Sequence, residues 1–366
     1  MPKTVTIDAR WLVGGIGTYT RNLLREFHQH SNGFEIRAIV RKRDFGTVRS
    51  FCPDLTVVDT PIYTVSEQLR IAHASRRSDL LHIPHYNAPL LHRGPLIVSI
   101  MDVIHLISPA NRRNLSAFFY AWPMLNAIAR KADHRVTVSS YSKNQIVDSL
   151  GIPGSKITDI PCGVSEEFTD HSRAPRDAVK LLGIPTPFLL YVGNLKPHKN
   201  VATLLRAFAR LCKTRKLPHS LLIVGDDTRW KRSIVDECSR LGIRDCTVFL
   251  PHVSQSLLPS VYAAADVVVM PSTVEGFGLP VLEAMACGTP VIASNVASLP
   301  EVAGDAALYF DPSSVEDLAL QIERILQSRE LQNCLRRKGL QQAKQFTWQK
   351  SAQQHAELYN RLLGLN

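Results

Sequence analysis

The chain has 366 residues, of which 45% are hydrophobic and 20% charged, and its formal net charge is +11. This length suits two domains better than one α/β core, and the composition is that of a folded globular chain. The basic residues form short groups without a recognition-helix or RNA-binding signature, so we expect no nucleic-acid partner. A positive net charge is also compatible with phosphorylated substrates and with peripheral contact with an anionic membrane.

The seven cysteines are scattered along the chain and include no C-x-x-C pair. This usage is typical of reduced thiols rather than of a disulfide framework. The sequence shows no apolar leader and no run of 18 apolar residues. These features together predict a cytoplasmic protein, whose membrane contact would be at the inner face of the cell membrane.

Short β-branched runs alternate with segments of helical period, which is the pattern of parallel sheets with crossover helices. The first half predicts an N-terminal Rossmann-like domain over residues 1–168, with helices such as 16–30 and 141–150. Its expected strands are 4–8, 34–40, 80–83, 96–101, 135–138 and 156–160.

A linker is expected around residues 165–186, where the chain loses periodicity and becomes rich in charge and turn formers. A second Rossmann-like domain then follows over residues 169–345. The last segment, 346–366, contains an amphipathic helix, whose apolar stripe needs a surface to pack on. The expected strands of the second domain are 188–192, 221–224, 247–250, 267–270, 291–293 and 307–310.

The loop after the fourth strand of the second domain is the most informative segment, because ligands of open parallel sheets bind beyond the carboxyl ends of the strands. Pro280 is placed as a first helical residue, which predicts a helix beginning at about Leu279. Gly276 and Gly278 leave the preceding loop without side-chain bulk, so its backbone N–H groups can approach a ligand. An anion is the natural guest of such a site.

Glu275 and Glu283 flank this expected anion site. Carboxylates beside a phosphate would repel it, so sugar and ribose hydroxyls are the better partners. The alternative is structural: Glu283 would only interact with the helix dipole, and Glu275 would be solvated.

The whole segment resembles the E-x7-E signature of glycosyltransferase family 4, whose members have the GT-B fold: two facing Rossmann-like domains with parallel sheets and an interdomain cleft. The resemblance implies a retaining enzyme in which Glu275 and the backbone of the following glycine-rich loop hold the donor sugar. It implies that Leu279 contacts the diphosphate through its backbone and that Glu283 binds the ribose hydroxyls. The loop residues concerned are Gly276, Phe277 and Gly278. The resemblance also implies that the C-terminal helix of residues 346–366 crosses back to pack on the N-terminal domain.

A second donor stretch follows the first strand of the second domain. Lys199 lies just before an expected helix that Asn200 can cap, and a full charge there adds to the helix dipole at a diphosphate site. Many family members have Gly-Arg-Leu-x-x-x-Lys here, whereas this chain has Gly193, Asn194 and no arginine. Lys196 is a candidate for the second positive charge, and a solvated lysine is the equal alternative.

Three further loops complete the expected donor site. Gly225 and Val253 follow strands at places where this family lodges the nucleobase, largely through backbone contacts. Gly15 and Gly17 lie in a glycine-rich turn that resembles the family loop facing the diphosphate, although a tight turn alone also asks for glycine.

The acceptor side is expected in the first domain. The family has a strand ending in His-Asp, and this chain has Met101 followed by Asp102. His105 is a candidate substitute for the missing histidine, and Tyr86 and Asn87 lie on another loop of the same domain. We assign the catalytic roles to Lys199, Glu275 and Asp102.

No metal or cofactor is expected. His82 and His85 lack a carboxylate or thiol that would complete a metal site, and the chain contains no Asp-x-Asp motif. The expected activity is transfer of a hexose, first mannose from GDP-mannose, to a saccharide or lipid-linked acceptor in surface polysaccharide biosynthesis. Two alternatives stay open: an epimerase of the same fold and a non-catalytic nucleotide-sugar-binding protein.

Overall fold

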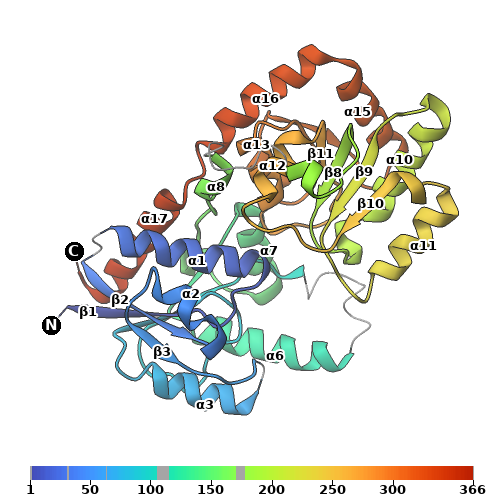
Figure 1. Cartoon of the computed structure of the whole chain (residues 1–366). Coiled ribbons are helices and arrows are strands. Elements are labelled where there is room, and N and C mark those ends of the chain that lie inside the picture. The colour runs from blue at the N-terminus through green and yellow to red at the C-terminus, as the bar shows by residue number, and fades with distance from the viewer. Residues whose placement is uncertain (1, 31–32, 63, 105–114, 170–177, 366) are drawn as a thin grey trace. The chain divides into compact units, whose positions relative to one another are not determined.

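The computed structural model describes residues 2–30, 33–62, 64–104, 115–169 and 178–365, and for residues 115–121 and 178 it describes the backbone only. The chain forms two compact units (Figure 1). Unit 1 comprises Met1–Gly163 and Thr347–Asn366, and unit 2 comprises Val164–Phe346. No described helix is long and apolar enough to cross a membrane.

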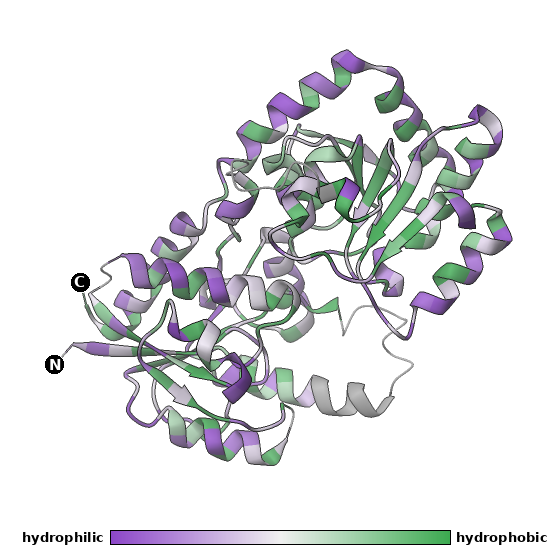
Figure 2. Cartoon of the chain, viewed as in Figure 1, coloured by the Kyte–Doolittle hydropathy of each residue, from purple (hydrophilic) through white to green (hydrophobic). Residues whose placement is uncertain are grey.

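Unit 1 contains a seven-stranded parallel sheet in the order β3-β2-β1-β4-β5-β6-β7. Its central strands are buried on both faces, which explains their continuous apolar sequences. Figure 2 shows the same hydrophobic character most clearly in the strands of unit 2. The strands are β1 (Lys3–Asp8), β2 (Phe34–Val40), β3 (Leu55–Val57), β4 (Leu80–Ile83), β5 (Leu96–Ser99), β6 (His134–Thr137) and β7 (Ile157–Asp159).

Helices cover the sheet of unit 1, and some of them begin with a side-chain cap. The side chain of Thr64 accepts a hydrogen bond from the amide of Glu67, and that of Ser139 accepts one from Ser142. The principal helices are α1 (Gly14–Gln29), α2 (Phe45–Arg49), α3 (Val65–Ala74), α6 (Leu115–Lys131), α7 (Ser140–Leu150) and α17 (Trp348–Leu363).

Unit 2 contains a six-stranded parallel sheet in the order β10-β9-β8-β11-β12-β13. The strands are β8 (Phe188–Val192), β9 (Ser220–Val224), β10 (Thr247–Leu250), β11 (Val267–Met270), β12 (Val291–Ser294) and β13 (Ala307–Phe310). The helices are α8 (Glu166–Thr169), α9 (Ala178–Leu181), α10 (Val201–Arg215), α11 (Lys231–Leu241), α12 (Leu258–Ala264), α13 (Leu279–Ala286), α14 (Leu299–Ala303), α15 (Val315–Gln327) and α16 (Arg329–Ala343).

Both sheets reverse their strand order at one point. In unit 1 the chain proceeds outward from β1 to β3 and then returns to β4 on the other side of β1. In unit 2 it proceeds from β8 to β10 and then returns to β11 on the other side of β8. The loops that leave the two strands at such a switch point diverge and open a crevice, so ligand sites are expected there.

The last helix, α17, belongs to unit 1 and packs against α1 and β4 (Figure 1). His82 of β4 interacts with the Tyr359 hydroxyl over 2.5 Å and with the Ser99 hydroxyl over 2.7 Å. His355 interacts through Nε2 with the Tyr19 hydroxyl over 2.5 Å. His82 is therefore a hydrogen-bonded core residue, and α17 completes the hydrophobic core of unit 1.

Some sequence-based boundaries are corrected by the structure. Unit 2 begins at Val164, so residues 164–169 are not a linker: Phe168 is buried there, and its ring lies 5.8 Å from that of Tyr262. The edge strand β3 was not expected, because three partly exposed residues leave no periodic signal. The sequence predicts that the second domain ends at residue 345, and in the structure unit 2 ends at Phe346.

Candidate active site

Two loops meet at the switch point of unit 2, one after β8 and one after β11. Asn200 joins them, because its side-chain amide donates hydrogen bonds to the carbonyl oxygens of Pro271 (3.0 Å) and Pro312 (2.9 Å). The Thr273 amide also donates to the His198 carbonyl over 2.8 Å. Asn200 occupies the N-cap position of α10, but its side chain does not cap the helix, which corrects the expected role.

The joined loops bring Lys199 and Glu275 together. The ammonium group of Lys199 lies 2.5 Å from Oε1 of Glu275, and the two side chains are only 13% and 8% exposed. The Ser272 hydroxyl donates to the same carboxylate oxygen over 2.9 Å. Two groups 76 residues apart in sequence are thus fixed as a partly desolvated charge pair at the carboxyl edge of the sheet.

The Ser298 side chain stabilises the glycine-rich loop of residues 275–278. Its hydroxyl lies 3.0 Å from the carbonyl oxygen of Glu275 and 2.9 Å from that of Phe277. The Phe277 ring packs 5.9 Å from that of Phe346, so its side chain stabilises the loop while its backbone borders the site. Gly278 has a φ of 108°, and a Cβ atom there would lie 2.8 Å from Leu299. Only glycine fits at this turn without strain.

Helix α13 begins at Leu279, as expected, with Pro280 in its first turn. Gly278 is the N-cap residue, so no cap side chain occupies the first amide groups of the helix. Pro280 has no N–H, and the Val281 amide donates to the Gly278 carbonyl over 2.9 Å, so an anion would meet the Leu279 amide and the positive end of the helix dipole. Gly276 is buried in the loop immediately before α13.

Glu283 lies one turn further into α13 and is partly buried. Its Oε2 accepts a hydrogen bond of 2.8 Å from the hydroxyl of Tyr262, which is fully buried. Burial raises the pKa of Glu283 to about 7, with the Tyr262 hydrogen bond opposing the shift. The carboxyl group is therefore positioned to accept hydroxyl hydrogen bonds when it is ionised.

The remaining donor candidates of unit 2 lie on the same edge of the sheet. A Cβ atom on Gly225, whose φ is 139°, would lie 1.9 Å from the carbonyl oxygen of Gly193, so the two backbones approach closely. Asn194 shapes this loop: its carbonyl accepts a hydrogen bond from Tyr191 and its side chain accepts one from the Lys196 amide. Val253, which follows β10, is buried.

The first-domain candidates lie in unit 1. A Cβ atom on Gly17 would lie 2.2 Å from the Leu12 carbonyl carbon, so this glycine is required by packing. No atom lies within 4 Å of a Cβ atom built on Gly15, so the described part of the chain places no steric demand on that glycine. Asp102 accepts a hydrogen bond from the Ile104 amide over 3.0 Å, and His105 lies outside the described residues.

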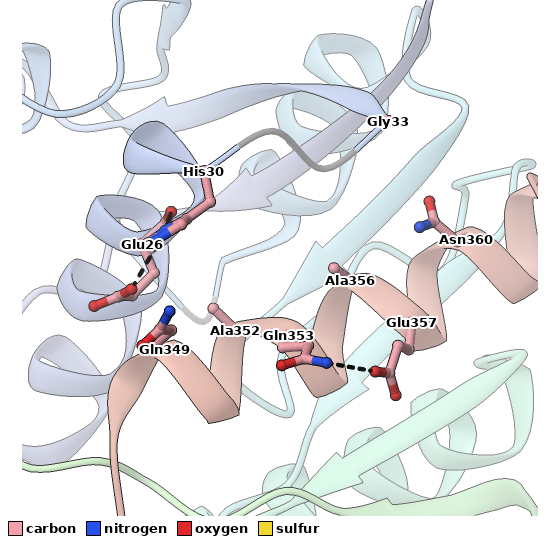
Figure 3. Close-up of a pocket in the computed structure, with 9 residues that line it drawn as sticks. All are labelled: Glu26, His30, Gly33, Gln349, Ala352, Gln353, Ala356, Glu357 and Asn360. Carbon is pink, nitrogen blue, oxygen red and sulfur yellow. Dashed lines mark hydrogen bonds and ion pairs between the residues drawn. The ribbon is translucent and has the colours of Figure 1, made fainter.

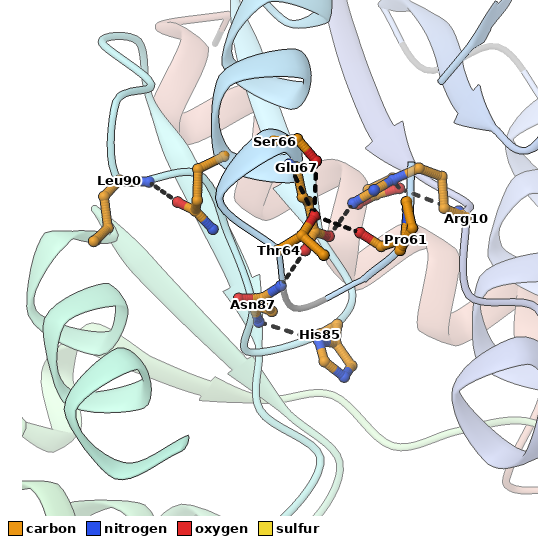
Figure 4. A network of polar contacts seen from close by, with 10 residues as sticks. Arg10, Pro61, Thr64, Ser66, Glu67, His85, Asn87 and Leu90 are labelled. Atoms are coloured by element: carbon orange, nitrogen blue, oxygen red, sulfur yellow. Dashed lines mark hydrogen bonds and ion pairs between the residues drawn. The ribbon is translucent and has the colours of Figure 1, made fainter. Parts of the chain in front are cut away.

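Asn87 belongs to a buried polar cluster that sequence reasoning missed (Figure 4). Its side-chain amide donates to Glu67 over 2.6 Å, and Glu67 also pairs with Arg10 over 2.6 Å. Tyr86 packs partly against the hydrophobic core and stacks on His85 with ring centroids 4.5 Å apart. Sequence reasoning missed several residues of the two sites, because each is an isolated polar residue outside any local motif. They are Arg10, Glu67, Ser272, Ser298 and Tyr262.

A surface groove in unit 1 lies between the C-terminal half of α1 and α17 (Figure 3). Small and polar side chains such as Gln349, Ala352 and Ala356 line it. It lies at the opposite end of α1 from the glycine-rich turn, so it is not part of the candidate site. The described residues contain no group of three His, Cys, Asp or Glu side chains that could hold a metal ion.

Comparison with known proteins adds the family. Residues 178–342 match the family model described as glycosyl transferases group 1, and residues 13–168 match glycosyltransferase family 4. The O-antigen chain mannosyltransferase B of Escherichia coli is 32% identical over 314 residues, which cover 81% of this chain and 80% of that protein. The chain belongs to glycosyltransferase family 4. This confirms the expected enzyme class, a hexosyltransferase.

Other relatives of this family 4 glycosyltransferase support the assignment. A D-inositol 3-phosphate glycosyltransferase of Mycolicibacterium smegmatis is 32% identical over 272 residues, which cover 70% of this chain and 61% of that protein. The crystal structure of Anabaena Alr3699/HepE in complex with UDP-glucose has a TM-score of 0.80 at 19% identity, and covers 98% of this chain and 99% of that chain. The fold is GT-B, as expected. The site residues have no such comparison and stay predictions.

Proposed function

We propose that this glycosyltransferase moves a hexose from a nucleotide sugar, GDP-mannose in the first place, to a saccharide or lipid-linked acceptor in surface polysaccharide biosynthesis. The name of one relative supports this choice, because it describes a mannosyltransferase of the O-antigen chain, a surface polysaccharide. A UDP-sugar is the second choice of donor, because the structural neighbour Anabaena Alr3699/HepE was solved in complex with UDP-glucose. We also propose a cytoplasmic enzyme in peripheral contact with an anionic membrane, for which the net charge of +11 is the support.

The contact between Lys199 and Glu275 carries the proposal. Breaking the bond from the anomeric carbon to phosphate places negative charge on the departing diphosphate. Lys199 and the positive end of the α13 dipole at Leu279 supply positive charge at one edge of the sheet, where that diphosphate would lie. Glu275 orients the lysine before the donor arrives and would then bind hydroxyls of the donor sugar.

The ribose of the donor would bind at Glu283. An ionised carboxylate can accept two hydrogen bonds from the ribose hydroxyls. The Tyr262 hydroxyl holds the Glu283 carboxylate in place by donating to its Oε2. The nucleobase would lie beyond, against the backbone of Gly225 and Val253. Glu275 would not attack the sugar: we propose retention of anomeric configuration by attack of the acceptor on the same face, without a covalent enzyme intermediate.

The proposed reaction needs no metal ion. The charge that a divalent cation would otherwise provide at the diphosphate comes from Lys199 and the α13 N-terminus. We expect the chelator EDTA to leave turnover unchanged. Loss of activity in EDTA, with recovery on adding Mg²⁺ or Mn²⁺, would show that this part of the proposal is wrong.

The decisive experiment is incubation of the full chain with a panel of GDP- and UDP-sugars, with nucleotide release and products measured with and without saccharide acceptors. We expect release with one donor, fastest with GDP-mannose, and an acceptor-dependent product. The anomeric configuration of that product, measured by NMR, should equal that of the donor. A product formed from the donor alone would favour an epimerase, and no turnover of any donor would contradict the proposal.

A further inference from the structure

A surface hollow of unit 2 lies beyond the last two strands of its sheet, away from the switch point between β8 and β11. In the strand order β8-β11-β12-β13 it follows the carboxyl ends of β12 and β13. Its lining comes from Asn295 and Val296 after β12, residues 309–312 at the end of β13, and Asp317 of α15. The hollow measures about 370 Å³, within the roughly 300–1,000 Å³ of ligand-binding pockets. None of these lining residues is among those assigned above to the donor or the acceptor.

The walls of the hollow are held by hydrogen bonds between its loops. The Asn295 amide donates to the Phe310 carbonyl over 2.9 Å, and the Asp311 amide donates to Oδ2 of Asp317 over 2.8 Å. The Pro312 carbonyl accepts a hydrogen bond of 2.9 Å from Asn200. The hollow is therefore formed before a ligand arrives, as most ligand pockets are.

Two exposed polar side chains of the hollow are available to a ligand. The Asn295 side chain makes no hydrogen bond with any described residue. Asp311 accepts through Oδ1 from the hydroxyl (2.7 Å) and the amide (2.8 Å) of Ser313, while its Oδ2 has no partner among the described residues. These hydrogen bonds from Ser313 lower the pKa of Asp311 below its ordinary value. The hollow thus presents an amide, which can donate and accept, and an ionised carboxylate oxygen, which accepts strongly.

Tyr309 provides an aromatic wall beside these polar groups. Its hydroxyl donates to the Gly304 carbonyl over 2.6 Å, which restrains the ring, and the side chain is partly exposed. Val296 and Pro312, also partly exposed, add apolar surface. A restrained aromatic ring offers apolar contact to one face of a ligand, while the polar side chains orient its hydroxyl groups. A saccharide ring has both an apolar face of C–H groups and hydroxyls at its edge.

The charge of the hollow selects against anions, and its free ligand atoms are too few for a metal ion. Two aspartates, Asp311 and Asp317, line it, so a phosphate or carboxylate would be repelled. Both oxygens of Asp317 already accept hydrogen bonds, Oδ1 from Gln321 over 3.0 Å and Oδ2 from the Asp311 amide. Divalent cations such as Ca²⁺ and Mg²⁺ take about six or more oxygen ligands, whereas a neutral hydroxyl needs one acceptor or donor.

We propose that this hollow is a secondary saccharide-binding site, in which a neutral hexose residue packs one face on Tyr309 and bonds through its hydroxyls to Asn295 and Asp311. The source of that residue rests on the proposed function. An enzyme that extends a polysaccharide meets its ligand as a chain, and one residue of this chain is held here. The hollow lies beyond β12 and β13, so this residue is not the one that receives the transferred sugar at the β8/β11 switch point.

The test is ligand-observed NMR of the full chain in EDTA, without nucleotide sugar, with methyl α-mannopyranoside, methyl α-glucopyranoside and methyl α-galactopyranoside. At least one glycoside should bind, and inorganic phosphate should not displace it. Asn295→Ala and Asp311→Asn should each weaken its binding by roughly three- to tenfold, the scale of one exposed hydrogen bond. Tyr309→Leu removes the ring and should weaken it similarly.

Matched controls come from the same unit. Tyr309→Phe also loses the hydrogen bond to Gly304 but keeps the ring, so it should bind the glycoside as the wild type does. Asn333 on α16 and Asp236 on α11 are exposed and do not line the hollow. Asn333→Ala and Asp236→Asn should therefore leave binding unchanged, and thermal melts should show that all of these variants fold.

Several results would overturn the inference. Failure of all three glycosides to bind in EDTA would show that the hollow does not hold a neutral saccharide by itself. Equal binding by the wild type, Asn295→Ala and Asp311→Asn would place the sugar elsewhere in the chain. Displacement by phosphate would indicate an anion site, and equal losses in Tyr309→Leu and Tyr309→Phe would show that the ring makes no contact. Failure of the proposed function is separate, because it would appear as no nucleotide release from any donor by the wild type.

Discussion

The two switch points of this glycosyltransferase occupy the same place in two similar sheets and have opposite chemistry. In unit 2, Lys199 pairs with a single carboxylate, Glu275, beside an uncapped helix N-terminus. In unit 1, Arg10 is surrounded by two carboxylates, Asp8 and Glu67, beside an aromatic face. The first arrangement offers positive charge to an anion, and the second offers hydrogen bonds to a neutral hydroxyl.

This difference shows what topology determines and what it leaves to side chains. The reversal of strand order creates a crevice in each sheet, but it does not select the ligand. Selection comes from the balance of charge at the carboxyl ends of the two flanking strands. The following predictions test whether the two regions really divide the work in this way, beginning with the largest expected effect.

Truncation before Thr347 should abolish transfer while donor binding is partly retained. The deletion removes Trp348, His355 and Tyr359, all buried in the core of unit 1, but no residue of unit 2. Calorimetry with and without a nucleotide sugar measures the result: the transition of unit 1 should be lost and the remaining one should still rise with donor. As a milder variant, Tyr359→Phe leaves Nδ1 of His82 unpaired and should cost about 1–3 kcal/mol. A truncated chain that transfers sugar at the full-length rate would contradict this account.

Lys199→Ala and Glu275→Ala should each lower turnover by roughly 10- to 1,000-fold, the scale of one lost transition-state electrostatic contact. The reason is loss of charge at the departing diphosphate in one case and of orientation of the sugar in the other. Steady-state kinetics with saturating donor measures the effect, and Lys213→Ala, an exposed lysine on α10, is the control. Wild-type turnover in both variants would remove these residues from the catalytic assignment.

Acid should destabilise unit 1 selectively between about pH 6.5 and 4. Burial lowers the pKa of His355 to about 4 and that of His82 well below its usual value, with the neighbouring His355 adding to the shift of His82. Above pH 6.5 both are neutral in either state. As the pH falls below 6.5, these histidines are protonated in the unfolded chain but stay neutral in the folded chain. The free energy of unfolding therefore decreases, by about 3 kcal/mol for His355 alone. Unfolding monitored from pH 7 to 4.5 should show this slope reduced in His355→Gln and unchanged in His252→Gln; equal slopes in all three proteins would contradict it.

Donor affinity should fall as the pH drops through about 7, because the raised pKa of Glu283 leaves a growing fraction protonated and unable to accept two ribose hydrogen bonds. A nucleotide sugar is the suitable probe, since its diphosphate does not titrate in this range. The change should be roughly tenfold from pH 8 to 6 by calorimetric titration. It should disappear in Glu283→Gln and persist in Glu316→Gln, an exposed carboxylate on α15. A flat profile in the wild type would exclude Glu283 as the ribose ligand.

The sequence allowed much of the fold to be predicted, because parallel strands buried on both faces leave unbroken apolar runs such as those of β8 and β11. The short edge strand β3 left no such run. The start of α13 could also be predicted, since Pro280 and the preceding glycines are local signals.

The contacts that build the two sites could not be predicted from local signals. Ser298 supports the glycine-rich loop from 21 residues away, and Arg10 meets Glu67 across 57 residues. Single serines and arginines are common on surfaces, so only the three-dimensional fold reveals these partners. Asn200 illustrates the reverse case: its type and position predicted a helix cap, whereas tertiary contacts with Pro271 and Pro312 recruited its side chain instead.

The central claim is that the switch point of unit 2 holds the donor, and hydrogen–deuterium exchange of the full chain with and without saturating GDP-mannose or UDP-glucose tests it most directly. Saturation is established beforehand by calorimetric titration of each nucleotide sugar. The account predicts that the strongest donor-dependent protection falls on residues 193–200 and 272–283, around Lys199 and Glu275. Residues 84–87 of unit 1, which include the acceptor-side candidates Tyr86 and Asn87, should show little change until a saccharide is added. A bound donor that leaves both unit 2 segments unprotected would contradict the account.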